Sequence, residues 1–214
     1  MAIYTEVYEA YNKSLLEELG LDWFQLIKHG MSGVYPDTCR LLVETVKLPL
    51  IKTVLEIGSG LSTVYLAKAC QKYGKEFLSL EESNEWLTET KKLLTICDLD
   101  PELVKLESSI DYSQITVPDF LFLDSQSQPR KVFPYKIEAA NPKFSNIYMW
   151  IEDDTQNPVF SVPMQKWLGE QKRYNTYNID LVGREDRHQL INYLDESFCF
   201  TSWIWSWRPD RKYW

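Results

Sequence analysis

The sequence predicts an α/β protein with a doubly wound, mostly parallel seven-stranded sheet, helices on both faces and an antiparallel C-terminal strand. Short apolar runs alternate along the chain with longer segments whose apolar residues recur at helical spacing. Such alternation is typical of parallel strands joined by helical crossovers. Polar residues follow several of the apolar runs, and the carboxyl ends of parallel strands are where sheets of this class bind ligands.

The first 50 residues precede the first predicted strand. Residues 4–29 carry apolar side chains at helical spacing and predict one or two helices. A loop with two glycines and a proline at 29–36 leads to a further helix, which Pro49 ends. We expect one domain over the whole chain, in which residues 1–50 form a helical N-terminal lid or extension and residues 51–214 form the α/β core.

Seven strands are predicted, at 53–57, 76–80, 103–106, 120–123, 147–151, 177–182 and 198–207. The run at 120–123 is apolar throughout, which predicts a strand buried on both faces. Ser62 or Thr63 and then Ser83 are expected to cap two helices, the first of them ended by Gly74. Further helices are predicted at 133–140, 162–174 and 186–194.

The clearest functional signal is the segment 53–63, Thr-Val-Leu-Glu-Ile-Gly-Ser-Gly-Leu-Ser-Thr. A strand opens there into Gly58 and Gly60, and a helical pattern follows at once. Glycine lets backbone approach a ligand closely, and the first N–H groups of a helix lack partners within it. Glu81 and Glu82 end the next strand, about 20 residues past the glycines, where a nucleotide-binding βαβ unit places the carboxylate that accepts ribose hydroxyls.

Composition and charge limit the classes of molecule that the protein is expected to bind. The chain has 214 residues, a net charge of −8 and no stripe of Lys and Arg, which argues against nucleic acid and favours a small-molecule substrate. No apolar run is long enough for a membrane span and no signal peptide is evident, so we expect a cytoplasmic protein that binds no membrane. Four well-separated cysteines predict buried, reduced thiols: Cys39, Cys70, Cys97 and Cys199.

The glycine turn and the strand ends of this chain resemble those of the class I S-adenosylmethionine-dependent methyltransferases, in particular the branch that acts on small molecules or sugars. The resemblance is carried by residues 54–60, by Glu81, by Leu-Glu-Ser-Ser-Ile-Asp-Tyr at 106–112 and by Phe-Leu-Phe-Leu-Asp at 120–124, and it covers residues 35–155. It implies a Rossmann-like fold, S-adenosylmethionine as cofactor and methyl transfer to a small-molecule acceptor, an oxygen of a sugar or other metabolite.

The resemblance also implies roles for the glycine turn. Gly58, Ser59 and Gly60 would lie against the methionine part of the cofactor, and Glu56 would hold the turn and the cofactor amino group. The chain departs from the fuller glycine motif at Leu61, where a third glycine is common.

The remaining cofactor roles fall at the ends of later strands. Glu81 would accept the two ribose hydroxyls, with Glu82 as the alternative. Ser109 and Ile110 would border the adenine, and Asp124 would sit beneath the sulfonium and the substrate.

An oxygen acceptor needs its pKa lowered by a metal or a base. Asp124, Asp153 and Asp154 end two strands and resemble the divalent-metal site of catechol-type O-methyltransferases, a set of oxygen ligands that suits Mg²⁺. Those enzymes continue after the strand-end aspartate with lysine and other basic or aromatic residues, whereas Ser-Gln-Ser-Gln stands here at 125–128. The other reading is that the three aspartates only cap a turn and order a loop.

A histidine base is the second way to activate an acceptor. His29 lies in the glycine loop before the first strand, where a lid could bring it to the substrate. His188 lies in a polar stretch and is expected on a solvated face.

The tryptophans have several readings. Three alternate with other residues near the C-terminus and share one face, which fits core packing, a homodimer interface or a sugar-stacking platform: Trp203, Trp205 and Trp207. Trp86 and Trp167 are expected to pack within their helices.

Two other functions compete with methyl transfer. An NAD-binding enzyme shares the first βαβ unit, but its fingerprint requires glycine where Thr63 stands, and Glu56 suits the methyl-donor family better. A non-catalytic subunit that retains the fold and binds a partner is the other alternative, favoured by the lack of basic residues directly after Asp124.

Overall fold

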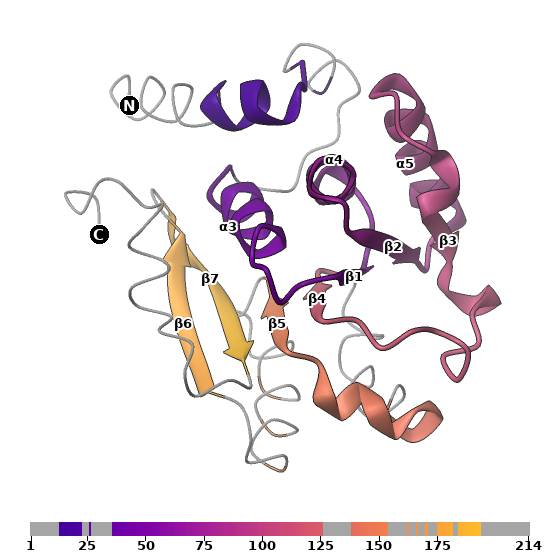
Figure 1. The fold of residues 1–214 in the computed structure, drawn as a ribbon, viewed down its shortest axis with the longest axis vertical. Helices are drawn as coiled ribbons and strands as arrows, with labels where there is room; N and C mark the ends of the chain where they lie inside the picture. The colour runs from indigo at the N-terminus through magenta and orange to yellow at the C-terminus, as the bar shows by residue number, and fades with distance from the viewer. Residues whose placement is uncertain are drawn as a thin grey trace.

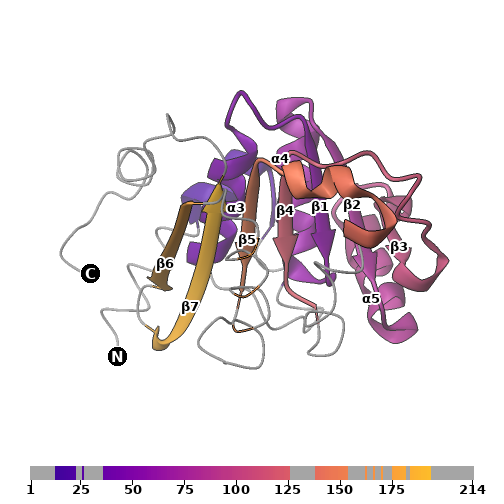
Figure 2. The ribbon, with the colours of Figure 1, turned by 90° about the horizontal axis from the view of Figure 1, so that it is seen from below.

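The computed structural model describes residues 13–22, 26, 36–125, 138–153, 162, 166, 170, 175–181 and 184–193. Within these residues the strands form a seven-stranded sheet in the order β3-β2-β1-β4-β5-β7-β6, which Figure 1 shows and Figure 2 lays out side by side. The strands are β1 Thr53–Ile57, β2 Glu76–Glu81, β3 Val104–Leu106, β4 Phe120–Leu123, β5 Met149–Glu152, β6 Asn175–Leu181 and β7 Arg184–Tyr193.

The part of the sheet from β3 to β5 is parallel, as predicted. The register pairs Ile57 with both Leu80 and Leu123, and Leu123 with Glu152, so the carboxyl ends of these strands line up along one edge. All four side chains of β4 are fully buried, as its apolar sequence predicts, because β4 lies between β1 and β5 with side chains packed on both faces.

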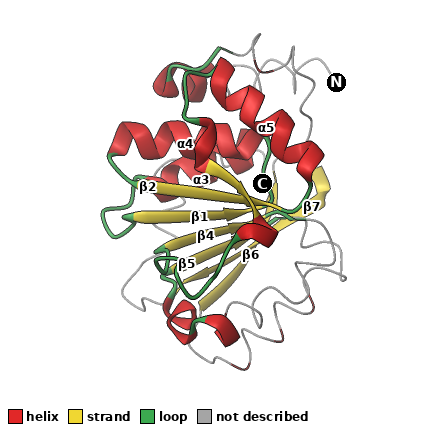
Figure 3. Cartoon of the chain, turned by 90° about the vertical axis from the view of Figure 1, so that its right-hand side faces the viewer, coloured by secondary structure: helices red, strands yellow, loops and turns green. Residues whose placement is uncertain are grey.

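The helices α3 Pro36–Val46, α4 Leu61–Tyr73 and α5 Asn84–Ile96 lie on one face of the sheet (Figure 3). Their apolar residues form a core with one set of strand side chains: Val54, Phe120, Phe122, Met149 and Ile151. The alternate side chains of the same strands point the other way, as the pleat requires, and pack with Tyr112, Phe144 and Ile147. Phe144 belongs to the 3₁₀ helix η3, Pro142–Asn146.

Helices on both faces were expected, and two of the predicted crossovers fall partly in the described residues. Residues 138–140 of the predicted helix at 133–140 are helical, and so are Val162, Lys166 and Glu170 in the one at 162–174. The other residues of these two segments lie outside the described part of the chain.

The prediction of a helix at 186–194 is wrong, because Arg184–Tyr193 forms β7. The polar sequence Arg-Glu-Asp-Arg-His-Gln at 184–189 has no clear strand alternation, and pairing with β5 and β6 decides its conformation instead. Both pairings are antiparallel. The antiparallel strand predicted at 198–207 lies outside the described residues.

The helix boundaries follow from local chemistry. The helix α4 begins at Leu61 with Gly60 as its N-cap, so neither Ser62 nor Thr63 caps it as predicted. Gly74 ends α4 in the left-handed conformation, as expected. Ser83 caps α5 as predicted, because its Oγ accepts a hydrogen bond from the N–H of Trp86 at 3.3 Å.

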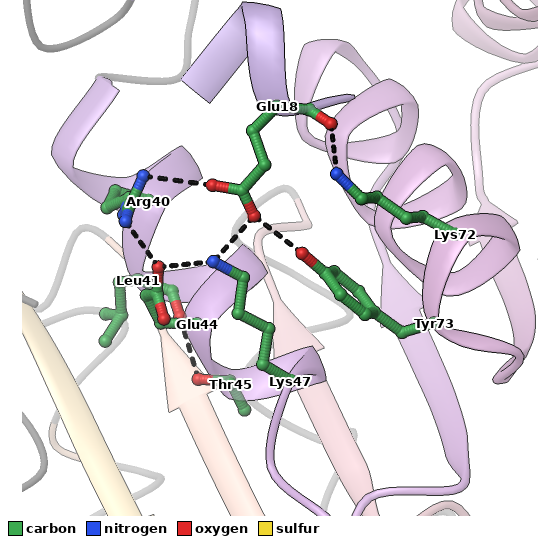
Figure 4. Close-up of polar contacts among 8 residues, drawn as sticks. All are labelled: Glu18, Arg40, Leu41, Glu44, Thr45, Lys47, Lys72 and Tyr73. Atoms are coloured by element: carbon green, nitrogen blue, oxygen red, sulfur yellow. Dashed lines mark hydrogen bonds and ion pairs between the residues drawn. The ribbon is translucent and has the colours of Figure 1, made fainter. Parts of the chain in front are cut away.

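The described residues before α3 join the same core. Residues 13–19 are helical, and Leu15, Leu16 and Leu19 are buried among the apolar residues of α3 and α4. The adjacent Glu18 forms a polar cluster with both helices (Figure 4). Among the residues that the structure describes, no helix is both long and apolar enough to cross a membrane.

Candidate cofactor site

The strand-end residues named by the sequence meet at the carboxyl edge of the sheet. Three backbone hydrogen bonds connect them: Gly58 N–H to the Leu80 carbonyl at 2.8 Å, Asp124 N–H to the Ile57 carbonyl at 2.8 Å, and Asp153 N–H to the Leu123 carbonyl at 3.2 Å. Backbone hydrogen bonds thereby join the glycine turn to the end of β2, and the ends of β1, β4 and β5 to one another.

Gly58 is glycine for a reason of packing. Its φ is +92°, and a Cβ added there would lie 2.3 Å from the backbone oxygen of Asp124 and 2.7 Å from the Cα of Ser125. A side chain at this position would therefore collide with the end of β4. The expectation that this glycine serves the approach of a ligand misses this internal contact, which applies whether or not a ligand is bound.

Glu56 is fully buried beneath the turn. Its carboxylate accepts hydrogen bonds from the hydroxyls of Ser62 at 2.5 Å, Thr63 at 2.7 Å and Ser79 at 2.7 Å. Burial raises the pKa of Glu56 to about 7, with a smaller contribution from the charge of Glu81, although the three hydroxyls act to lower it. The carboxylate thus joins β1 to β2 and to the start of α4, and it has no exposed surface.

Thr63 supports the turn from a second direction. Its Oγ1 accepts a hydrogen bond from the Gly60 N–H at 2.8 Å while donating to Glu56. The residue that breaks the NAD fingerprint thus joins the start of α4 to the buried carboxylate, a contact that glycine at this position could not make.

Glu81 connects β2 to the glycine turn. One carboxylate oxygen accepts from the Ser59 N–H at 2.7 Å and the Ser59 hydroxyl at 2.8 Å, and the other accepts from the Ser83 N–H at 2.9 Å. The Ser59 hydroxyl also lies 2.9 Å from the hydroxyl of Thr90 on α5. Only 5% of Glu81 is exposed, whereas Glu82 is half-buried.

The residues implied to border an adenine follow β3, at the same edge of the sheet. Ser109 is exposed and its hydroxyl donates to the Leu106 carbonyl at 2.6 Å, while Ile110 is half-buried against the second core. Sequence reasoning gave no role to Tyr112, which is buried and donates to Glu107 Oε1 at 2.8 Å. Burial, followed by the contact with Glu107, raises the pKa of Tyr112 above its ordinary value.

The candidate metal ligands are described only in part. Asp124 is half-buried and Asp153 is buried, and the backbone bond between their strands makes them neighbours. In the described part of the chain no three His, Cys, Asp or Glu side chains form a group that could hold a metal ion. Asp154 and His29 lie outside that part. His188 lies on β7, in register with Asp180 of β6.

Two residues of α5 that were not predicted to belong to the site also lie at this edge. Thr90, which the sequence analysis did not single out, contacts the glycine turn through its hydroxyl. Trp86 was expected to pack within its helix, yet 41% of it is exposed. The spacing of four residues between them could have indicated that they lie together, because it places both on one face of α5.

Comparison with known proteins identifies the fold. No family model matches the chain, and no curated protein sequence matches it. An O-methyltransferase from Bacillus cereus solved in complex with SAH has a TM-score of 0.62 and 16% identity, over 90% of this chain and 97% of that one. A proposed O-methyltransferase from Klebsiella pneumoniae has a TM-score of 0.65 and 16% identity, over 91% and 97%.

A third structure, the O-methyltransferase TomG from Streptomyces achromogenes in complex with SAM, has a TM-score of 0.58 and 15% identity, over 89% of this chain and 88% of that one. These similarities extend over most of both chains. The chain therefore has the Rossmann-like fold of the S-adenosylmethionine-dependent methyltransferases, as the sequence resemblance implies.

Proposed function

We propose that the chain is a class I methyltransferase that transfers the methyl group of S-adenosylmethionine to a small molecule, at an oxygen of a sugar or other metabolite. The observation that carries the proposal is the bonding of Glu81 to Ser59, which sets a carboxylate against the glycine turn at the carboxyl edge of the sheet. A fold alone hosts many functions, so the proposal depends on this local geometry.

When bound, S-adenosylmethionine supplies a methyl group on a sulfonium, which is already an activated leaving group. The protein then has mainly to hold donor and acceptor in line. Glu81 would accept the ribose hydroxyls, Ser109 and Ile110 would border the adenine, and Asp124 would face the reacting centre. The buried Glu56 would keep the turn in shape for the methionine part, which Ser59 and Gly60 would contact.

The acceptor oxygen would be activated by Mg²⁺ or by a base. Asp124 and Asp153 follow neighbouring strands whose ends are joined by a backbone hydrogen bond, they carry the carboxylates that Mg²⁺ prefers, and Asp154 follows directly in the chain. His29 is the candidate base. Addition of EDTA to an active preparation separates the two, since only the metal-dependent reaction loses its rate and regains it with added Mg²⁺.

Calorimetry with S-adenosylmethionine, S-adenosylhomocysteine and NAD tests the cofactor. We expect both sulfur compounds to bind and NAD not to bind. Binding of NAD alone would refute the proposal.

Catalysis is tested by incubating the protein and labelled S-adenosylmethionine with fractions of a metabolite extract. Transfer of label to a fraction supports an enzyme and starts the identification of its acceptor. Cofactor binding without transfer to any fraction would instead favour the non-catalytic subunit.

Substitution of Glu81 tests the ribose contact. Glu81→Gln removes the charge but keeps the shape, and we expect a loss of S-adenosylhomocysteine affinity on the order of 1.5–3 kcal/mol, because the diol would lose its charged acceptor. Glu82→Gln, at the next position, is the matched control and should bind within about twofold of the unaltered protein. The reverse pattern in calorimetry would assign the ribose to Glu82.

A further inference from the structure

Trp86 lies on the inner face of its helix, although it is exposed. Helical spacing places Trp86, Thr90 and Leu93 on one face of α5, one above the other. Thr90 and Leu93 are almost completely buried, at 0% and 1% exposure, whereas Trp86 is 41% exposed. The face that packs on the sheet therefore continues past the core to Trp86, which stays partly exposed.

The direction of α5 places this ring at the carboxyl edge of the sheet. The helix follows β2 directly, so its first turn stands at the end of that strand. Side chains of a helix lean toward its N-terminus, so Trp86 projects beyond Thr90 and away from the core. Thr90 already contacts Ser59 of the glycine turn, which places the ring one helical turn further out, on the ligand side of that contact.

The backbone of this first turn is fixed by the same residues that shape the site. Ser83 accepts a hydrogen bond from the Trp86 N–H and donates its own N–H to Glu81. A single chain of contacts thus runs from the proposed ribose acceptor through the helix cap to the exposed tryptophan.

We propose that Trp86 forms a wall of the cofactor pocket and packs its ring on the nucleoside half of S-adenosylmethionine. This inference deepens the proposed function and rests on it. An indole covers the apolar faces of ribose and purine well, and the nearby Glu81 would bind the hydroxyls at the edge of the sugar. Among the described residues three large apolar side chains are exposed: Leu50, Trp86 and Val162. A bound nucleoside would cover the exposed part of Trp86.

Calorimetric titration with S-adenosylhomocysteine and with adenosine tests the contact. Stacking of an aromatic side chain on a base predicts that Trp86→Ala weakens the binding of both ligands by about tenfold or more. Trp86→Phe should retain most of the affinity. Leu50→Ala is the control, because Leu50 is an exposed apolar residue just before the opposite end of β1, and it should not change binding.

A second measurement works on the unaltered protein. Hydroxyl-radical labelling read by peptide mass spectrometry should show that saturating S-adenosylhomocysteine protects Trp86 from oxidation. Unchanged labelling of Trp86 by a protein that binds the ligand would overturn the inference, as would full affinity in a folded Trp86→Ala variant.

The outcomes also separate this inference from the proposed function. If Trp86→Ala loses affinity for S-adenosylhomocysteine but not for adenosine, the ring contacts the methionine half and the assignment to the nucleoside is wrong. If the unaltered protein binds neither sulfur compound, the proposed function fails and this inference fails with it.

Discussion

Gly58 and Glu56 illustrate at the scale of single residues how a ligand-binding motif is also a packing motif. The first is required by the approach of β4, and the second gathers three hydroxyls beneath the turn. The apolar pattern of the sequence located the turn, but the collision and the hydroxyl cluster arise between segments far apart in the chain. These contacts had no signal in the local sequence.

Alanine at position 58 should destabilise the fold strongly. Gly58→Ala adds a Cβ that collides with backbone and is also strained at positive φ, so we expect a loss of about 3 kcal/mol or more in the free energy of unfolding. Gly74→Ala is the control, with φ of +65° but no atom within 4 Å of the added Cβ, and should cost about 1 kcal/mol. Equal losses in urea unfolding would show that the collision is relieved at little cost.

The raised pKa of Glu56 predicts a dependence of stability on pH. The pKa rises from an ordinary value of 4.5 to about 7 on folding, so the folded state binds this proton more tightly. The resulting stabilisation is complete below pH 4.5 and is lost as the pH rises through about 7.

Glu56→Gln tests this dependence, because glutamine stays neutral. We expect the stability advantage of the unaltered protein over the variant to fall by about 2.5 kcal/mol between pH 5 and pH 8. The measurement is urea unfolding at both pH values, and the difference between the two proteins cancels the titration of the other groups. A constant difference would contradict the raised pKa.

At the scale of elements, a polar cluster joins the helix at 13–19 to α3 and α4. Glu18 contacts Lys47 at 2.6 Å, Tyr73 at 2.6 Å and Arg40 at 3.3 Å, and its backbone carbonyl accepts from Lys72 (Figure 4). Burial acts to raise the pKa of Glu18, but the bonds from Lys47 and Tyr73 and the nearby positive charges outweigh it and lower the pKa. The cluster therefore holds a charged carboxylate.

Loss of the Glu18 charge should weaken the attachment of this helix. Glu18→Gln is expected to lower stability by about 1 kcal/mol at pH 7. Because the pKa of Glu18 is lowered on folding, the effect should shrink as the pH falls below the ordinary value of 4.5. Glu17→Gln is the matched control in the same helix, where the pair with Lys13 is exposed, and should change stability by less than about 0.5 kcal/mol. Thermal unfolding of both variants measures the two losses of stability, and equal losses would contradict the prediction.

Elements were predictable where local chemistry determines them. The apolar runs located β1 to β6 to within a few residues, and Gly74 and Ser83 marked helix ends correctly. The cap of α4 was misplaced because Ser62 and Thr63 use their hydroxyls on a buried carboxylate instead. The strand β7 was missed because its pairing partners, rather than its own sequence, fix its conformation.

For the whole molecule, the sheet divides two apolar cores and carries the candidate site on its edge. The strands β1, β2, β4 and β5, which end at this edge, contribute buried side chains to those cores. The parallel topology was predicted from alternating elements, and it correctly placed the ends of β1, β2, β4 and β5 together. The direct bonds of Glu81 to Ser59, and of Ser59 to Thr90, could not be predicted because they depend on side-chain geometry after assembly.

Ligand binding should stabilise the whole fold if the proposed function is right. S-adenosylhomocysteine at about one hundred times its dissociation constant adds about 2.7 kcal/mol to the free energy of unfolding. For a chain of this size the melting temperature should then rise by roughly 5–10 °C. Differential scanning fluorimetry with S-adenosylhomocysteine, and with NAD as the control ligand, measures the rise.

The contact between Gly58 and the end of β4 affects what the sequences of related proteins can reveal about cofactor binding. A lineage that lost its cofactor would still keep glycine at position 58, since the collision penalises every other residue with or without a ligand. Position 86 is under no such backbone constraint, and 41% of Trp86 is exposed. A bulky aromatic residue retained at that position across distant relatives would therefore mark the branches that still bind the nucleoside.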